Sequence, residues 1–243
     1  AVPVRTLQAT MMQLEKSELL NIKLPDGAIP ERGGVEIGFR KHLSDGLSGV
    51  REFMTRYPYA CFEQRASKVI ALQDANGWKS LMNTLPAYLD RDGLVKYFPV
   101  MTEGDDTLTA YLLSIADEAG YEIPDDAQGK MLNGLAGFIE GRVIRYSAFP
   151  ATDLNLRRLA AISALSRKGR INQKWFDSIS IEPNLWPTSA VLDWLSILKY
   201  TPKFPMHAKL LTEAKQILRS RLNFQGTTMG FSTEKGDALW WLM

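Results

Sequence analysis

Apolar residues recur at helical spacing through most of this chain, and this periodicity limits the possible folds more than any other feature. Leu47, Val50 and Phe53, for example, are spaced so that they fall on one face of a helix. Comparable patterns predict helices over residues 61–72, 106–119, 125–144, 154–167, 187–200 and 206–222. The sequence therefore predicts a mainly α protein, built from helix pairs joined by short turns.

Several of the predicted helices are apolar around much of their circumference. The run 159–165, Leu-Ala-Ala-Ile-Ser-Ala-Leu, is an example. Helices of this kind are buried on more than one side, which favours a layered arrangement with an inner ring of helices inside an outer ring. A helical solenoid is the alternative, but no strict repeat period supports it.

The two ends of the chain differ from this helical body. Residues 1–40 contain turn sequences, and the alternating segment Val35–Phe39 predicts a strand. We therefore divide the chain into a short β-type connector, residues 1–40, and a helical domain, residues 41–243. Residues 236–243 begin an apolar helix that stops in mid-pattern, so we expect a fragment of a longer protein, truncated at the C-terminal end of its helical domain.

Composition and charge exclude several classes of function. The 29 basic and 27 acidic residues give a net charge of +2, which offers no electrostatic basis for binding nucleic acid. The single cysteine, Cys61, and the two histidines, His42 and His207, lack metal-ligand spacing, so we predict no metal or other cofactor. The scattered lysines and arginines are interpreted as a solvated surface, and the tryptophans as core residues.

The surroundings of Cys61 carry the most specific chemical pattern in the chain. Pro58 ends the preceding helix, Cys61 lies in the first turn of the next one, and Gln64 lies three positions further on the same face. Attack of the Cys61 sulfur on the Gln64 carboxamide, with loss of ammonia, gives an internal thioester. A thioester hydrolyses unless water is excluded. The local candidates for a dry cover are three large rings, Tyr57, Tyr59 and Phe62.

Segment 57–64, Tyr-Pro-Tyr-Ala-Cys-Phe-Glu-Gln, resembles the thioester motif of the α2-macroglobulin and complement family. Bacterial members carry a similar Tyr-Pro-Tyr-Gly-Cys-Leu-Glu-Gln. Segments 31–35, 46–50 and 109–113 also fit, and the resemblance covers the chain from about residue 20 to its end. Ala60 replaces the usual glycine and Phe62 the usual glycine or leucine, but both lie outside the reacting pair.

The resemblance implies both a fold and a function. The thioester domain of this family is an α/α toroid of helix hairpins, and it interrupts a small β-sandwich domain to which residues 1–40 would belong. The whole protein is a broad-spectrum protease trap. Cleavage of a bait region elsewhere in the chain exposes the thioester, and a protease nucleophile such as a lysine amine attacks the Gln64 carbonyl. The protease is then held covalently, and Cys61 becomes a free thiol.

The resemblance further implies a single-use inhibitor rather than a turnover enzyme. Its partners would be target proteases and the other domains of the same full-length chain. Bacterial relatives are periplasmic or lie in the cell envelope, and membrane contact would come only through a lipid anchor outside this chain. Glu63 is expected to have a structural role at the helix start, where negative charge is favourable, or to assist proton transfer during thioester formation.

Two other interpretations stay open. One is a structural paralogue domain that keeps Cys61 and Gln64 without forming the bond, since a lone cysteine is commonly a small buried residue. The other is an α/α toroid enzyme acting on a polyprenyl or carbohydrate substrate through acidic residues. The acidic pairs Asp105-Asp106 and Asp125-Asp126 each precede a predicted helix, so helix capping explains them. His207 is interpreted as a surface or capping residue.

Overall fold

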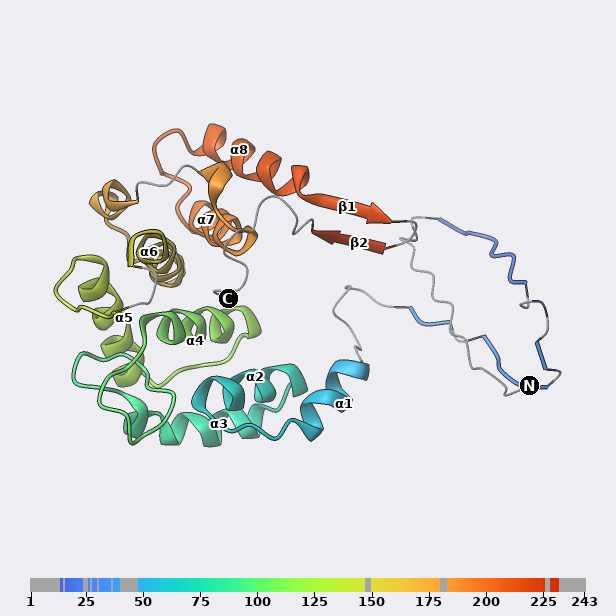
Figure 1. The fold of residues 1–243 in the computed structure, drawn as a ribbon, viewed down its shortest axis with the longest axis horizontal. Coiled ribbons are helices and arrows are strands. Elements are labelled where there is room, and N and C mark those ends of the chain that lie inside the picture. Colours follow the sequence, from blue (N-terminus) through green and yellow to red (C-terminus); the bar gives the residue numbers. More distant parts are fainter. Residues whose placement is uncertain are drawn as a thin grey trace. The chain divides into compact units, whose positions relative to one another are not determined.

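The computed structural model describes residues 14, 16–23, 26, 28–29, 31–35, 37–39, 48–146, 150–179, 183–225 and 228–231. The chain divides into two units, residues 1–47 with 223–230 and residues 48–222 with 231–243, and each is considered by itself. The second unit contains the helices (Figure 1).

The regular elements are helical except at the end of the described chain. The α-helices are α1 (Ser48–Arg56), α2 (Phe62–Leu72), α3 (Ala75–Thr84), α4 (Asp106–Ala119), α5 (Asp125–Ile139), α6 (Pro150–Ser166), α7 (Thr188–Tyr200) and α8 (His207–Ser220). Short 3-10 helices are η1 (Leu85–Tyr88), η2 (Gln173–Ser178) and η3 (Pro183–Leu185). Strands β1 (Leu222–Gln225) and β2 (Thr228–Phe231) form a two-stranded sheet. The prediction of a mainly α protein is confirmed.

Most predicted helices are present with small shifts at their ends. α4 has the predicted limits because Asp105 caps its start, accepting from the Leu108 N–H at 2.7 Å, and Gly120 ends it with φ of 71°. α5 ends earlier than predicted, at Ile139, because the chain turns at Gly141 with φ of 75°. α3 was not predicted from the sequence. It contains Gly77, a poor helix former, and its start is fixed by the Asp74 side chain.

The core of the helical unit surrounds α6. This helix packs against α4, α5 and α7, while α2 packs against α3 and α4 (Figure 1). The buried side chains on α6 include Leu159, Ile162 and Leu165, each with no exposed surface. Burial on several sides of one helix is what its Ala- and Leu-rich sequence predicted. The four tryptophans in the described chain, Trp78, Trp175, Trp186 and Trp194, are buried as predicted.

The predicted strand at residues 35–39 is wrong for the described part of that segment. Val35 and residues 37–39 have no regular structure, and the Val35, Ile37 and Phe39 side chains are between 59% and 80% exposed. Among the described residues, no strand pairs with this segment, and alternating sequence alone does not make a strand. The helix predicted from residue 236 lies outside the described residues. Among the helices that the structure describes, none combines the length and apolar character needed to cross a membrane.

Candidate functional site

The site is built at the junction of α1 and α2. The Tyr57 N–H donates to the Met54 carbonyl at 3.3 Å as α1 ends, and the chain then passes through Pro58 without regular structure. Cys61 is the N-cap residue of α2, with extended backbone angles. Its carbonyl accepts from the Arg65 N–H at 3.0 Å, which closes the first turn of the helix. The sequence prediction that Cys61 opens a helix is confirmed.

Cys61 and Gln64 share this first turn. Gln64 is the third residue of α2, and its side-chain oxygen Oε1 accepts a hydrogen bond from the Cys61 backbone N–H at 3.1 Å. This contact is one half of a capping box, and it folds the carboxamide back over the residue that carries the sulfur. Cys61 is 8% exposed, and Gln64 is half-buried. The Gln64 carboxamide is therefore held against the backbone of a residue whose thiol is largely removed from solvent.

Three aromatic residues that precede Cys61 in the sequence, Phe53, Tyr57 and Tyr59, contact one another in turn. The ring centroids of Phe53 and Tyr57 are 5.4 Å apart, and those of Tyr57 and Tyr59 are 5.2 Å apart. Tyr59 and Phe53 are each 62% exposed, and the rings border a shallow hollow of about 450 Å³ beside Glu52 and Arg56. Two of the rings named from the sequence, Tyr57 and Tyr59, thus form an outward-facing cluster.

Phe62, the third ring named from the sequence, points the other way. It has no exposed surface and packs on Tyr88 with ring centroids 4.6 Å apart. Burying a side chain of this size stabilises a fold by roughly 2–3 kcal/mol. Phe62 therefore anchors the first turn of α2 in the core and supports the neighbouring Cys61 from inside the protein.

Glu63 is joined to α4 through a short hydrogen-bonded chain. The Ser67 hydroxyl donates to Glu63 Oε1 at 2.6 Å, and the Ser67 and Tyr111 hydroxyls are 2.8 Å apart. Ser67 is one helical turn after Glu63, a spacing that the sequence already contains. The contact to Tyr111 arises only from the packing of α2 on α4, which no local pattern predicts.

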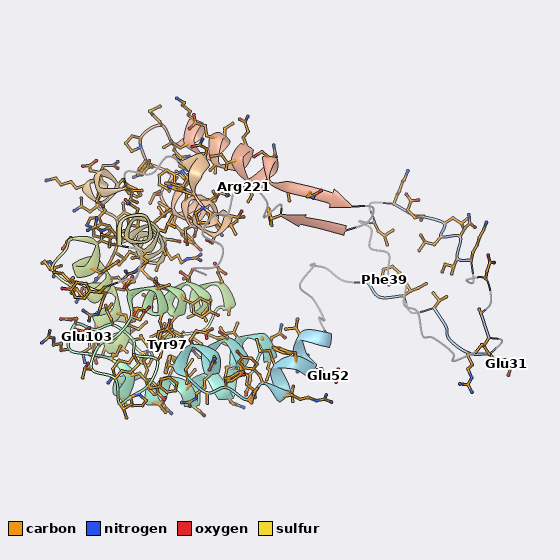
Figure 2. The ribbon with its side chains drawn as sticks, in the orientation of Figure 1. Glu31, Phe39, Glu52, Tyr97, Glu103 and Arg221 are labelled. Carbon is orange, nitrogen blue, oxygen red and sulfur yellow. The ribbon has the colours of Figure 1, made fainter. Side chains whose placement is uncertain are left out.

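Tyr97 was not identified from the sequence, yet it lies at the start of α2. Its carbonyl accepts from the Phe62 N–H at 2.9 Å, satisfying one of the free amides of the first turn. Burial raises the pKa of its phenol to about 12, and the charges of Asp105, Glu63 and Cys61 add to this effect. Tyr97 is therefore close to the N-terminal turns of both α2 and α4 (Figure 2).

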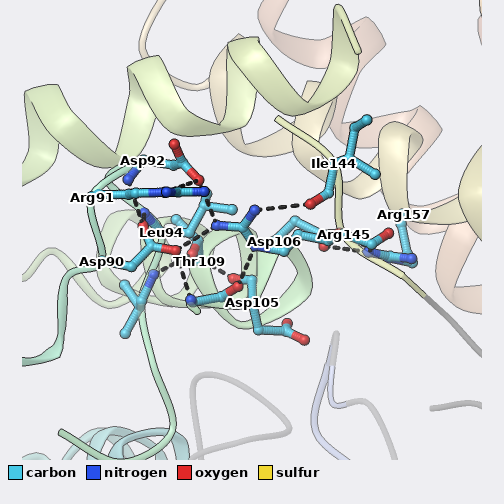
Figure 3. Close-up of polar contacts among 12 residues, drawn as sticks. Asp90, Arg91, Asp92, Leu94, Asp105, Asp106, Thr109, Ile144, Arg145 and Arg157 are labelled. Carbon is cyan, nitrogen blue, oxygen red and sulfur yellow. Dashed lines mark hydrogen bonds and ion pairs between the residues drawn. The ribbon is translucent and has the colours of Figure 1, made fainter. Parts of the chain in front are cut away.

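A polar network holds the segment that carries Tyr97. Asp90 accepts from the N–H groups of Leu94 at 2.9 Å and Gly104 at 2.7 Å, and from the Arg145 guanidinium (Figure 3). Burial opposes ionisation of Asp90, but these hydrogen bonds and the Arg145 charge outweigh it and lower its pKa. Within the same segment, Gly93 has φ of 84° and lies against the backbone of Lys130 on α5, where a Cβ would not fit.

The acidic pairs do more than cap helices. Asp105 caps α4 as predicted, but Asp106 is buried and forms an ion pair with Arg157 of α6. Asp126 is exposed and pairs with Lys130 one turn later at 2.8 Å, and the N-cap position of α5 is taken by Pro124. Asp105, Asp106 and Asp126 therefore each make a different structural contact. In the described residues, no group of three or more His, Cys, Asp or Glu side chains is arranged to hold a metal ion.

The basic residues and His207 make specific contacts within the helical unit. The lysines and arginines are not all solvated, because Arg145, Arg157 and Arg167 are between 8% and 11% exposed and paired with acids. His207 is the first residue of α8, and its Nε2 lies 2.9 Å from the Leu198 carbonyl. This contact ties α8 to α7, which fits a structural role. His42 lies outside the described residues.

The fold resembles that of a bacterial protein. One similar structure is the crystal structure of native α2-macroglobulin from Escherichia coli, spanning domain MG7 to the C-terminus, with a TM-score of 0.56 and 17% identity. Another is the cryo-EM reconstruction of the native conformation of E. coli α2-macroglobulin, with a TM-score of 0.55 and 18% identity. Each comparison covers 70% of this chain, but only 31% and 12% of the respective E. coli chains.

Sequence comparison adds no closer relation. No family model matches this chain, and no curated protein matches its sequence. The likeness therefore lies in the fold. This chain has a mainly α fold similar to part of a bacterial α2-macroglobulin.

Proposed function

We propose that this chain is the thioester domain of a bacterial α2-macroglobulin-like protease inhibitor. The observation that carries the proposal is the hydrogen bond from the Cys61 N–H to Gln64 Oε1 at 3.1 Å. It brings the carboxamide of Gln64 onto the residue that bears the thiol, in the order and spacing of the family's thioester motif. Loss of ammonia from Gln64 then joins Cys61 Sγ to the Gln64 acyl carbon.

The likeness to the E. coli protein supports this assignment at the level of fold. We further propose that the helix pairs belong to an α/α toroid and that residues 1–40 belong to an adjoining β-sandwich domain. The hairpin packing of α2 on α3 and of α6 on α7 is compatible with a toroid. The domain would work with other domains of a longer chain, in the periplasm or cell envelope.

The proposed capture reaction is an acyl transfer. An amine of the attacking protease adds to the Gln64 acyl carbon, the carbon–sulfur bond breaks, and Cys61 leaves as a thiolate that takes up a proton. The products are an amide linking the protease to residue 64 and a free thiol. Developing negative charge on sulfur is favoured by the positive end of α2, and each thioester is consumed once.

The aromatic cluster has a proposed role in this scheme. A thioester must stay dry until it is triggered, and Tyr57 and Tyr59 lie on the chain leading to Cys61. We propose that they form part of the cover over the thioester, with Phe62 and Glu63 as supporting residues. Because Tyr59 is 62% exposed, the cover needs a further layer from elsewhere in the full protein.

The test is the intact mass of freshly purified protein, before and after methylamine. We expect a mass short by one ammonia, then a gain of one methylamine with release of one thiol. Cys61→Ser is the matched variant: serine is a preferred N-cap residue, so the helix start is kept while both mass changes disappear.

A full mass with a free thiol requires peptide mapping of position 64. Glutamate at that position shows that a thioester formed and hydrolysed. Unmodified glutamine shows that the bond never formed, which would overturn the proposal and favour a structural paralogue domain.

A further inference from the structure

Glu63 lies between Cys61 and Gln64 in the sequence, and its carboxylate is held more firmly than a helix-start acid needs. The Ser67 hydroxyl donates to Glu63 Oε1 at 2.6 Å and contacts the Tyr111 hydroxyl at 2.8 Å. A carboxylate that served only the helix dipole would gain its stabilisation without either contact. The Ser67 hydroxyl instead fixes its orientation, and the Tyr111 hydroxyl of α4 in turn holds Ser67.

Glu63 and Cys61 both influence the Tyr97 phenol, and Glu63 also influences the Tyr111 phenol. Burial raises the pKa of Tyr111; the Ser67 hydrogen bond opposes this rise, and the Glu63 charge adds to it. The Tyr97 phenol responds to Glu63 and also to Cys61. The backbone carbonyl of Tyr97 accepts from the Phe62 N–H at the start of α2, and its phenol is within electrostatic reach of both the Glu63 carboxylate and the Cys61 sulfur.

We propose that Glu63 is the general base of the capture reaction, and that Ser67 and Tyr111 are its positioning residues. This inference rests on the proposed thioester. The Ser67 hydroxyl donates to Glu63 Oε1, and in the described part of the chain no hydrogen bond to Glu63 Oε2 is formed. We therefore assign Oε2 as the oxygen that accepts the proton. Tyr111 is 36% exposed, which gives solvent and an incoming amine access to this side of α2.

The proton balance of the step is complete without a further reactant. The amine nitrogen forms a bond to the Gln64 acyl carbon, and the bond from that carbon to Cys61 Sγ breaks. One proton passes from the amine nitrogen to Glu63 Oε2. Glu63 then returns it to the Cys61 thiolate, so the products are an amide, a neutral thiol and the original carboxylate.

The experiment follows thiol release by methylamine in the full chain at about pH 8, where carboxylates are ionised. Intact mass is measured first for every variant, so that only protein with the ammonia loss enters the kinetics. We expect Glu63→Ala to slow thiol release about 100-fold, the lower range for loss of a general base. Formate should restore part of the rate in Glu63→Ala, in proportion to its concentration, because it replaces the missing carboxylate.

The roles of Ser67 and Tyr111 are tested by combining their substitutions with Glu63→Ala. Ser67→Ala and Tyr111→Phe should each slow the reaction several-fold in the native background, and neither should slow Glu63→Ala further. Ser220→Ala and Tyr200→Phe are matched controls, since each removes a hydroxyl hydrogen bond away from α2. Both controls should react at the native rate.

The outcomes separate the two proposals. A native chain without the ammonia loss overturns the thioester and this inference together. A thioester whose reaction is unchanged in Glu63→Ala, or not restored by formate, overturns the general base alone. If Glu63→Ala fails to form the thioester, Ser67→Ala and Tyr111→Phe still decide the matter, because they keep the carboxylate; native rates in both would overturn the inference.

Discussion

At the scale of single residues, the site depends on side chains that also build the helix start. Gln64 Oε1 satisfies the Cys61 N–H, and the Tyr97 carbonyl satisfies the Phe62 N–H. Each of these amides would otherwise lack a partner within the helix. The same contacts hold Cys61, Gln64 and Tyr97 at one helix start, where Glu63 also lies. Local helix capping and the proposed chemistry are thus two consequences of one arrangement.

The Tyr97 phenol gives a prediction at this scale. Its pKa rises from 10.0 to about 12 in the folded protein, first through burial and then through nearby negative charge. The folded state therefore holds its proton more tightly than the unfolded state, and stability falls as the pH rises through this range. We expect the Tyr97→Phe variant to lose up to about 2 kcal/mol less stability than the native protein as the pH rises through this range.

The measurement is the free energy of unfolding by denaturant, at several values between about pH 9 and pH 11.5. Below the ordinary tyrosine pKa, the free energies of unfolding of the native protein and Tyr97→Phe should change with pH in the same way. Above that pKa, the native protein should lose stability faster than the variant. Tyr59→Phe is the control, because Tyr59 is exposed and should leave the profile unchanged. Parallel profiles for all three proteins would show that Tyr97 is not perturbed.

At the scale of elements, the segment between η1 and α4 acts as a support for the site. It has no helix or strand of its own, and its shape depends on Asp90, which accepts from three backbone amides and pairs with the buried Arg145. Val95 is fixed as well, since its N–H donates to the Thr109 hydroxyl of α4 at 2.8 Å. Tyr97 follows directly after these anchored residues.

Asp90→Ala tests this support. The change leaves three backbone amides without their acceptor and removes one of the two acids that pair with Arg145, so we expect a loss of about 3 kcal/mol in the free energy of unfolding. Asp126→Ala is the matched control, because its ion pair with Lys130 is exposed and should contribute less than about 1 kcal/mol. Equal effects of the two variants would contradict the role of Asp90.

Sequence patterns predicted the elements whose signals are local. α4 was located correctly because Asp105 and Gly120 mark its ends, and Cys61 was placed correctly because Pro58 precedes it. α3 was missed because its propensity is weak and tertiary packing decides it. The same holds in the site. Cys61 and Gln64 are close in the sequence, whereas Tyr97 and Tyr111 reach α2 only through the packing of separate segments.

At the scale of the whole helical unit, charged residues join α4, α6 and α7. In the turn directly after α6, Arg167 pairs with Glu118 of α4 at 2.6 Å, and Lys168 pairs with Asp117 at 2.9 Å. Asp193 of α7 faces the same region. Burial raises its pKa to about 6, although the Arg167 charge acts in the opposite direction. An acid that is costly to ionise therefore lies in the region where these charged residues meet.

The sign of this effect sets the pH dependence of stability. The pKa of Asp193 is higher in the folded state than its ordinary value of 3.8, so the folded state binds more protons between these values. Its favourable contribution is complete below the unfolded pKa and is lost as the pH rises through about 6. At neutral pH, the native protein therefore carries the full cost of an ionised, buried Asp193.

Asp193→Asn removes that cost. We expect the variant to be more stable than the native protein by about 2 kcal/mol at about pH 8, with the difference vanishing near pH 3.5. Denaturant unfolding across this range is the measurement, and Asp177→Asn is the control, because Asp177 is an exposed residue of η2. If Asp193→Asn were instead less stable at pH 8, the Ser163 hydrogen bond and the Arg167 charge would together outweigh the burial of Asp193.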